Sequence, residues 1–145
     1  MIEQHYGELS MDDALHASLE ALLNRYAISE NAERLVLNCR QMSYYRRRQG
    51  LHPIEVQLKR ESGTSPWLVV FFASFSYPND SSTAVEPELY FHLANRWCYQ
   101  PDVGSTDLSH PEVQELLSVW MKAFARHLSR NVFDDMQLTM VGTFH

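Results

Sequence analysis

The spacing of apolar residues changes twice along the chain, and this change constrains the fold more than any other feature. Over residues 15–26 the apolar positions recur every three or four residues, which predicts a helix over 11–28 with one apolar face. Over residues 35–93 apolar and polar positions mostly alternate, which is the period of a β-strand. A second helical stripe covers residues 113–128. The sequence therefore predicts helices flanking a β-rich middle.

Both expected helices have start signals. Ser10 with Asp13, and Ser109 with Glu112, each have the spacing of a capping box, in which two side chains bond the free backbone amides of the first turn. Pro111 suits a first turn, where its missing N–H removes no hydrogen bond. The second helix is expected to end near Arg130.

Alternation predicts five strands and a short additional one. They lie at 35–40, 54–59, 67–75, 88–93, 136–140 and, more briefly, around 96–99. Strands joined by short connections pair antiparallel, and helices at the flanks pack on one face. We expect an α+β fold in the order α-β-β-β-β(-β)-α-β. In it, an antiparallel β-sheet of about five to six strands packs against an N-terminal helix and a helix in the C-terminal half.

The length of 145 residues predicts a single α+β domain over 1–145. The N-terminus does not resemble a secretory signal, and the longest apolar run, 67–75, is far shorter than a membrane span of about 20 residues. Cys39 and Cys98 have no CxxC spacing, which suits a reducing compartment. We expect a cytoplasmic protein with no membrane partner.

Charge is distributed unevenly. The net charge is −6, which disfavours nucleic acid as a partner. Residues 34–60, however, contain seven basic residues and one acidic residue, a net charge of +6, so the rest of the chain carries −12. The basic segment is expected to contact an acidic protein partner or the acidic part of a second copy.

Motifs with a known catalytic geometry are missing. The sequence contains no GxGxxG, P-loop, HExxH, GxSxG or CxxC. Glu88 and His92 are four residues apart in an expected strand, and about 13 Å then separates them, which is too far to share a metal ion. The sequence predicts no catalytic residue, metal ligand or cofactor, and the interpretation leans away from an enzyme.

The run from Tyr44 to Arg48 is the first candidate binding segment. Aromatic rings beside arginines can stack on bases and pair with phosphates, which would make the protein a nucleic-acid accessory factor. The alternative is a solvated hairpin tip, in a loop expected over 43–51. The residues concerned are Tyr44, Tyr45, Arg46, Arg47 and Arg48.

The strand over 67–75 is the second candidate, because it is apolar on both faces. If Trp67, Val69, Phe71 and Phe75 face the helices, then an opposite set points away, beside Tyr90. That set is an interface candidate, unless the strand is simply buried on both sides within the monomer. It consists of Leu68, Val70 and Phe72.

A third candidate is a small-molecule or enzyme pocket between the sheet and the helices. His52, Tyr77 and His92 are the residues expected near it, and Tyr90 is a further candidate binding residue. Pro53 holds His52 in an extended conformation, so a structural role for His52 is the stronger expectation.

Three short segments carry a resemblance to a known family. They are Gly50-Leu-His-Pro-Ile-Glu-Val56, Phe75-Ser-Tyr77 and Glu86-Pro-Glu-Leu-Tyr-Phe91. With them the chain resembles the bacterial domain-of-unknown-function family numbered 2787. Where that family tends to alternate aspartates with phenylalanine, this chain has Tyr90 and His92. The resemblance implies a small bacterial protein, often encoded on mobile genetic islands.

The expected architecture is also similar, at the level of the fold, to the acidic mitochondrial matrix proteins, which assemble into ring-shaped trimers. Together these features favour a non-enzymatic binding or accessory protein that acts through protein–protein contacts and forms a homo-oligomer. The alternatives are the nucleic-acid factor, the small-molecule-binding protein or enzyme, and a secretion-type chaperone, which would also be small, acidic and α+β.

Overall fold

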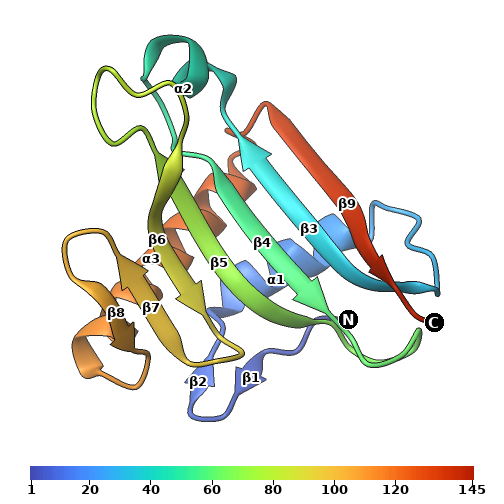
Figure 1. The fold of residues 1–145 in the computed structure, drawn as a ribbon. Helices are drawn as coiled ribbons and strands as arrows, with labels where there is room; N and C mark the ends of the chain where they lie inside the picture. The colour runs from blue at the N-terminus through green and yellow to red at the C-terminus, as the bar shows by residue number, and fades with distance from the viewer.

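The computed structural model describes all residues, 1–145, and its centre is a seven-stranded antiparallel sheet (Figure 1). Its strand order is β8-β7-β6-β5-β4-β3-β9, and a separate hairpin pairs β1 with β2. The strands are β1 (His5–Tyr6), β2 (Leu9–Ser10), β3 (Ala32–Arg40), β4 (Ile54–Lys59), β5 (Leu68–Ser76), β6 (Glu86–His92), β7 (Trp97–Gln100), β8 (Gly104–Asp107) and β9 (Asp135–Thr143). The α+β class and the antiparallel sheet are confirmed. The sheet has more strands than expected because β8, with the sequence Gly-Ser-Thr-Asp, has no apolar alternation.

Two long helices cover one face of this sheet, and the other face has no helix in front of it (Figure 1). They are α1 (Asp13–Leu23) and α3 (Pro111–Ser129), which also contact each other. The two expected capping residues, Ser10 and Ser109, are wrong. Asp12 caps α1 by accepting from Leu15 N at 3.2 Å, and His110 caps α3 by accepting from Glu112 N. A side chain adjacent to the first turn can satisfy the same free amides, so the motif does not fix the residue.

The hydrophobic core lies between the helices and the sheet, and it follows from the alternation in the strands. Ile54, Val56 and Leu58 of β4 point into it, together with the apolar stripes of α1 and α3. Its largest fully buried side chains include Phe72, Phe91 and Phe124. Burying one aromatic side chain of this size contributes about 2 kcal/mol.

The strand β5 contains a β-bulge that overturns the expected assignment of its faces. Leu58 pairs with Val69 but the preceding Gln57 pairs with Phe71, so Val70 is an extra residue. An inserted residue reverses the in-and-out order of all that follow. Phe72 therefore enters the core, 5.2 Å from the Trp120 ring, whereas Phe71 lies on the opposite face.

The interface patch expected at Leu68, Val70 and Phe72 is consequently wrong. Phe72 is completely buried, and Val70 is buried in a small second cluster with Phe71 and Ala73. Phe75, expected against the helices, packs against this same second cluster. Only Leu68 remains partly exposed. Most of β5 is thus covered on both faces within one copy of the chain.

The segment expected to be a loop over 43–51 begins with a short helix, α2 (Met42–Arg47). It ends at Arg48, whose φ of 60° places it in the left-handed region. Gly50 follows with φ 107°, a conformation that side chains rarely adopt, and a Cβ there would lie 2.1 Å from Gln41 Oε1. The glycine thus permits the close return of the chain toward β4. No helix in the protein is long and apolar enough to cross a membrane.

Candidate functional site

The open face of the sheet, opposite the two long helices, carries exposed aromatic side chains on β6 and β7. Phe91 and its partner Cys98 are fully buried on the helix side, so their neighbours in each strand project to the other face. Tyr90 pairs with Tyr99 and His92 pairs with Trp97, and all four are partly exposed. The register of β6 and β7 therefore brings four rings together.

Three of these rings, those of Tyr90, His92 and Trp97, stack on one another. The Tyr90 and Trp97 ring centroids are 5.1 Å apart with only 9° between the planes, and His92 lies 5.0 Å from Trp97. On the other side Tyr90 stacks on Phe71 at 4.7 Å, which connects the stack to the buried cluster of β5. Parallel rings at these separations attract each other and hold their orientation. The stacking therefore favours one common orientation of the exposed rings.

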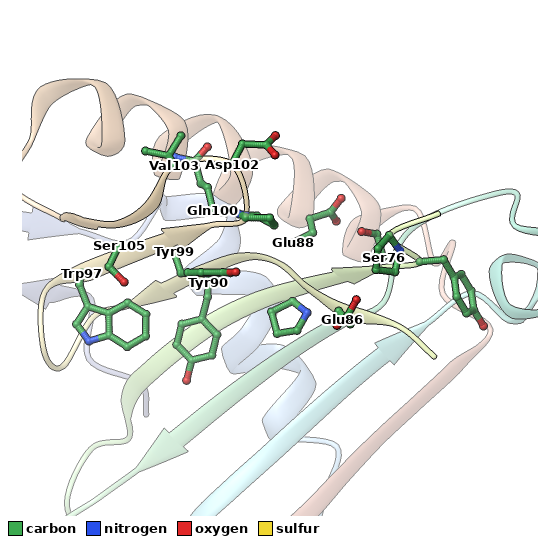
Figure 2. Close-up of a pocket in the computed structure, with 14 residues that line it drawn as sticks. Ser76, Glu86, Glu88, Tyr90, Trp97, Tyr99, Gln100, Asp102, Val103 and Ser105 are labelled. Atoms are coloured by element: carbon green, nitrogen blue, oxygen red, sulfur yellow. The ribbon is translucent and has the colours of Figure 1, made fainter. Parts of the chain in front are cut away.

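A groove of about 830 Å³ lies over this part of the sheet, and we refer to it as the open-face groove (Figure 2). Tyr90, Trp97 and Tyr99 contribute its aromatic lining. The rest comes from the end of β5 and the residues after it, the start of β6, the end of β7, the turn between β7 and β8, and β8. The complete lining is Ser76, Tyr77, Pro78, Glu86, Pro87, Glu88, Tyr90, Trp97, Tyr99, Gln100, Pro101, Asp102, Val103 and Ser105.

The groove is negatively charged. Glu86, Glu88 and Asp102 line it, and no lysine, arginine or histidine does. Glu88 is already partnered, because its carboxylate lies 2.7 Å from His52 Nδ1. Glu86 and Asp102 are exposed and take part in no ion pair.

The neighbouring rings add little positive charge. Desolvation lowers the pKa of His92 below its ordinary 6.5, and the nearby Lys59 lowers it further, which favours the neutral form of His92. Desolvation and, to a smaller extent, the carboxylate of Glu55 raise the pKa of Tyr90 above 10. Both shifts therefore favour the uncharged ring.

The uneven charge of the sequence has a spatial counterpart. The basic segment forms β3, α2 and β4, whereas the groove lies over β6, β7 and β8 on the other side of β5. Arg34 Nη1 donates to Gln57 Oε1 at 3.2 Å, and Arg40 Nη1 donates to Asp135 Oδ2 at 3.4 Å. These arginines are thus held by groups on their own part of the sheet.

A second aromatic group, which we call the Tyr44 cluster, lies at one end of the sheet. It comprises Tyr44, Tyr45, Arg48, His52 and Tyr77. Tyr44 is buried, its ring is 4.6 Å from that of His52, and its hydroxyl oxygen accepts from Tyr77 N at 3.0 Å. The Tyr45 ring lies 6.5 Å from that of Tyr77. The guanidinium carbon of Arg48 lies 3.3 Å from the centre of the Tyr77 ring.

The three adjacent arginines consequently differ. Arg48 is held by Tyr77 and by the Ser82 carbonyl oxygen, which accepts from Nη2 at 2.9 Å. Arg46 and Arg47 are exposed and make no ion pair. Tyr44 is closed off inside the protein, so it is not available for stacking on a base.

A smaller cavity of about 270 Å³ lies between the sheet and α3. Its walls include Ile54, Leu89, Trp120 and Phe124, and His52 is at its lining with Glu88. Tyr77 and His92, expected beside His52 in such a pocket, do not line it. No group of three or more histidine, cysteine, aspartate or glutamate side chains has the arrangement of a metal site.

Comparison with known proteins places the chain in a family. A family model for DUF2787, described as a protein of unknown function, matches residues 13–139. The chain belongs to the DUF2787 family. A search of curated protein sequences finds no match.

Two Vibrio cholerae proteins with solved structures share the fold of this DUF2787 protein. One is the conserved hypothetical protein VC1805 from pathogenicity island VPI-2, with 22% identity and a TM-score of 0.78 over 96% of this chain and 100% of that chain. The other is the hypothetical protein VC0508 from the VSP-II pathogenicity island, with 20% identity and a TM-score of 0.83 over 97% and 100%. The VC1805 structure shares structural homology with the human P32 protein, so the expected fold-level similarity to the mitochondrial acidic matrix proteins is confirmed.

Seven of the nine predicted binding residues of this DUF2787 protein divide between two places, and Arg46 and Arg47 are exposed outside both. Tyr44, Tyr45, Arg48, His52 and Tyr77 meet in the Tyr44 cluster, while Tyr90 and His92 lie in the stack on the open face. Of the residues that line the groove, sequence reasoning predicted only Tyr77 and Tyr90 as binding residues, and it missed four others that give the groove its rings and charge. They are Glu86, Trp97, Tyr99 and Asp102. The alternation of Trp97 and Tyr99 around Cys98 was the available signal, once β7 is paired with β6.

Proposed function

We propose that this protein is a non-enzymatic binding protein that holds an extended segment of a partner protein in the open-face groove. One observation carries this proposal: Tyr90, Trp97 and Tyr99 line a groove on the face of the sheet that no helix covers. Tryptophan and tyrosine are the side chains that most often dominate binding energy at protein interfaces. A stack of them that favours one common orientation is suited to contact with little reorganisation.

The structure supports contact on this face over a purely structural role for the stack. The core on the helix side is already closed by fully buried aromatic residues such as Phe72 and Phe91. Tyr90 and Trp97 are only partly buried, so their exposed area is still available for a partner. Each aromatic side chain can bury roughly 150–250 Å² in total, which makes the remaining area a useful contribution to affinity.

The charge of the groove favours a protein segment over nucleic acid. Glu86 and Asp102 would repel a phosphate backbone, since no basic side chain lines the groove to offset them. The side chains that line the groove come from four successive strands, β5 to β8, and a surface of this extent suits an extended chain (Figure 2).

Peptide selection tests this proposal directly. The purified protein is panned against a random peptide library, and bound sequences are measured by fluorescence anisotropy against wild type, Tyr90→Ala and Trp97→Ala. We expect at least a tenfold loss of affinity in both variants. Tyr26→Ala is the matched control, because Tyr26 is also a partly exposed tyrosine but lies beyond α1. Peptides that bind both groove variants as tightly as wild type would remove the proposal.

The segment bound in the groove could also belong to a second copy of this chain. Self-association is therefore a second outcome that a separate measurement must distinguish. The exposed Arg46 and Arg47 have the charge that the groove would attract. Light scattering after size-exclusion at low and high salt distinguishes the two sources. A mass above 16.9 kDa at low salt that falls in Trp97→Ala would identify the second copy as the occupant.

The proposed location is the cytoplasm. Cys39 and Cys98 are both buried and unpaired, which suits a reducing compartment. Fractionation of cells that express the tagged protein checks this: a signal in the periplasmic or secreted fraction would contradict it.

A further inference from the structure

We infer that the segment bound in the open-face groove presents a lysine or arginine side chain, which lies against the Tyr90–Trp97 stack and is paired by Glu86 and Asp102. This inference rests on the proposed function and names the chemistry of its ligand. It is carried by three features of the groove, which concern its carboxylates, its rings and the chain's own arginines.

The carboxylates lack positive partners. Of the three acidic side chains at the groove, only Glu88 has a side-chain partner, because its carboxylate lies 2.7 Å from His52 Nδ1. Arg96 bonds the Tyr6 carbonyl oxygen and Glu8, and Arg40 bonds Asp135. Lys59, which lies near His92, makes no ion pair with Glu86 or Asp102 and does not line the groove. Glu86 and Asp102 thus give the groove a negative charge that the molecule does not neutralise itself. A cation from outside would meet that charge.

The rings offer a matching surface. A cation is attracted to the face of an aromatic ring, most strongly to tryptophan, when it lies within about 6 Å of the centroid. Trp97 lines the groove and stacks by one face on Tyr90, whose own ring lies between those of Trp97 and Phe71. The outer face of Trp97 is therefore the ring face that a cation can reach. Carboxylates beside such rings add a charge-assisted hydrogen bond that fixes the end of a long basic side chain.

The protein already contains this contact at the end of the groove. Tyr77 lines the groove, and Arg48 of the same chain lies over its ring at 3.3 Å. A second example is Arg60, which lies over Trp67 at 4.2 Å. Tyr90 and Trp97 have no such arginine, although they lie in the same groove as Tyr77. The Arg48–Tyr77 contact therefore shows, within the same chain, the kind of cation–π contact that we infer for a basic side chain of the partner.

The test uses the peptides that panning selects, so that each part of the account can fail separately. We expect the selected sequences to be enriched in lysine and arginine relative to the starting library. Replacing the key arginine by citrulline, which has the same shape without the charge, should weaken binding at least tenfold in isothermal titration calorimetry. Glu86→Gln with Asp102→Asn should weaken it similarly and reduce its dependence on salt. Glu115→Gln, an exposed carboxylate on α3, is the matched control and should bind as wild type does.

Each outcome has a distinct meaning. If uncharged peptides are selected and Trp97→Ala still abolishes their binding, the groove binds protein but the inferred charge selectivity is wrong. If basic peptides bind equally to wild type and to the Glu86/Asp102 double variant, the carboxylates do not recognise them and the inference is overturned. If no selected peptide responds to Trp97→Ala, the proposed function itself fails.

Discussion

The two faces of the sheet use aromatic residues in opposite ways, and the strand β6 shows both. Its Phe91 is fully buried and packs near Trp120, 5.8 Å away, whereas the adjacent Tyr90 and His92 are partly exposed and stack with Trp97. The helix side consists of one continuous core that includes 27 buried residues, against three in the cluster on the open side. The core thus stabilises the fold from one side, and the other face keeps partly exposed aromatic rings.

The largest expected effect is a difference in stability between a substitution on the helix side of the sheet and one on the open face. Phe72→Ala removes a fully buried ring and should reduce the free energy of unfolding by about 3–5 kcal/mol, because the surrounding core cannot collapse into the space. Trp97→Ala should cost less, since its ring is already in contact with water. Urea denaturation monitored by circular dichroism measures both. Equal losses would mean that the open face is as structural as the core.

A pH titration that compares wild type with Cys39→Ala tests the contribution of one buried group on the helix side. Burial raises the pKa of the Cys39 thiol from 9.0 to about 12. The unfolded thiol therefore loses its proton at lower pH than the folded one, and stability should fall as pH rises from about 9 toward 12. The slope from this group approaches 1.4 kcal/mol per pH unit, and it should disappear in Cys39→Ala. An unchanged slope in that variant would show that the thiol is accessible to water when folded.

The Tyr44 cluster should respond more weakly than the core. Tyr44→Phe removes the hydroxyl oxygen that accepts from Tyr77 N, while the ring stays in place. We expect a loss of about 1 kcal/mol in the free energy of unfolding. Peptide binding should change less than in Trp97→Ala. A greater loss of binding than of stability would move the binding site toward this end of the sheet.

The smallest effect is expected at the exposed arginines. Arg46→Ala with Arg47→Ala should change the free energy of unfolding by less than about 0.5 kcal/mol, because neither residue makes an ion pair. Binding to single-stranded DNA or RNA at low salt, measured by fluorescence anisotropy, should be absent in wild type. Tight binding that the double substitution removes would restore the nucleic-acid hypothesis.

The spacing of apolar residues predicted most of the helices and strands. It failed where a strand has no alternation of apolar and polar residues. The strands around Leu37, Val56 and Phe91 follow from alternation, because each has one buried face. The bulge at Val70 has no signal in a run that is apolar at every position, so the faces of Phe71 and Phe72 were exchanged.

The groove was harder to predict because it depends on register. Tyr90 and His92 were identified from their strand, but Trp97 and Tyr99 join them only through the pairing of β6 with β7. Asp102 comes from the turn between β7 and β8, and its position depends on the unexpected strand β8. Residues that are brought together by two successive strand pairings, β6 with β7 and β7 with β8, have no characteristic spacing in the sequence.

The three tryptophans provide the most direct test, because they lie on different faces. Trp67 and Trp120 belong to the helix side, and Trp97 lines the open-face groove. In a ¹H–¹⁵N NMR spectrum each gives a separate indole Nε1–H signal. Addition of a selected basic peptide should shift the Trp97 signal and leave those of Trp67 and Trp120 in place. Shifts at Trp120 or Trp67 with none at Trp97 would contradict the assignment of binding to the open face.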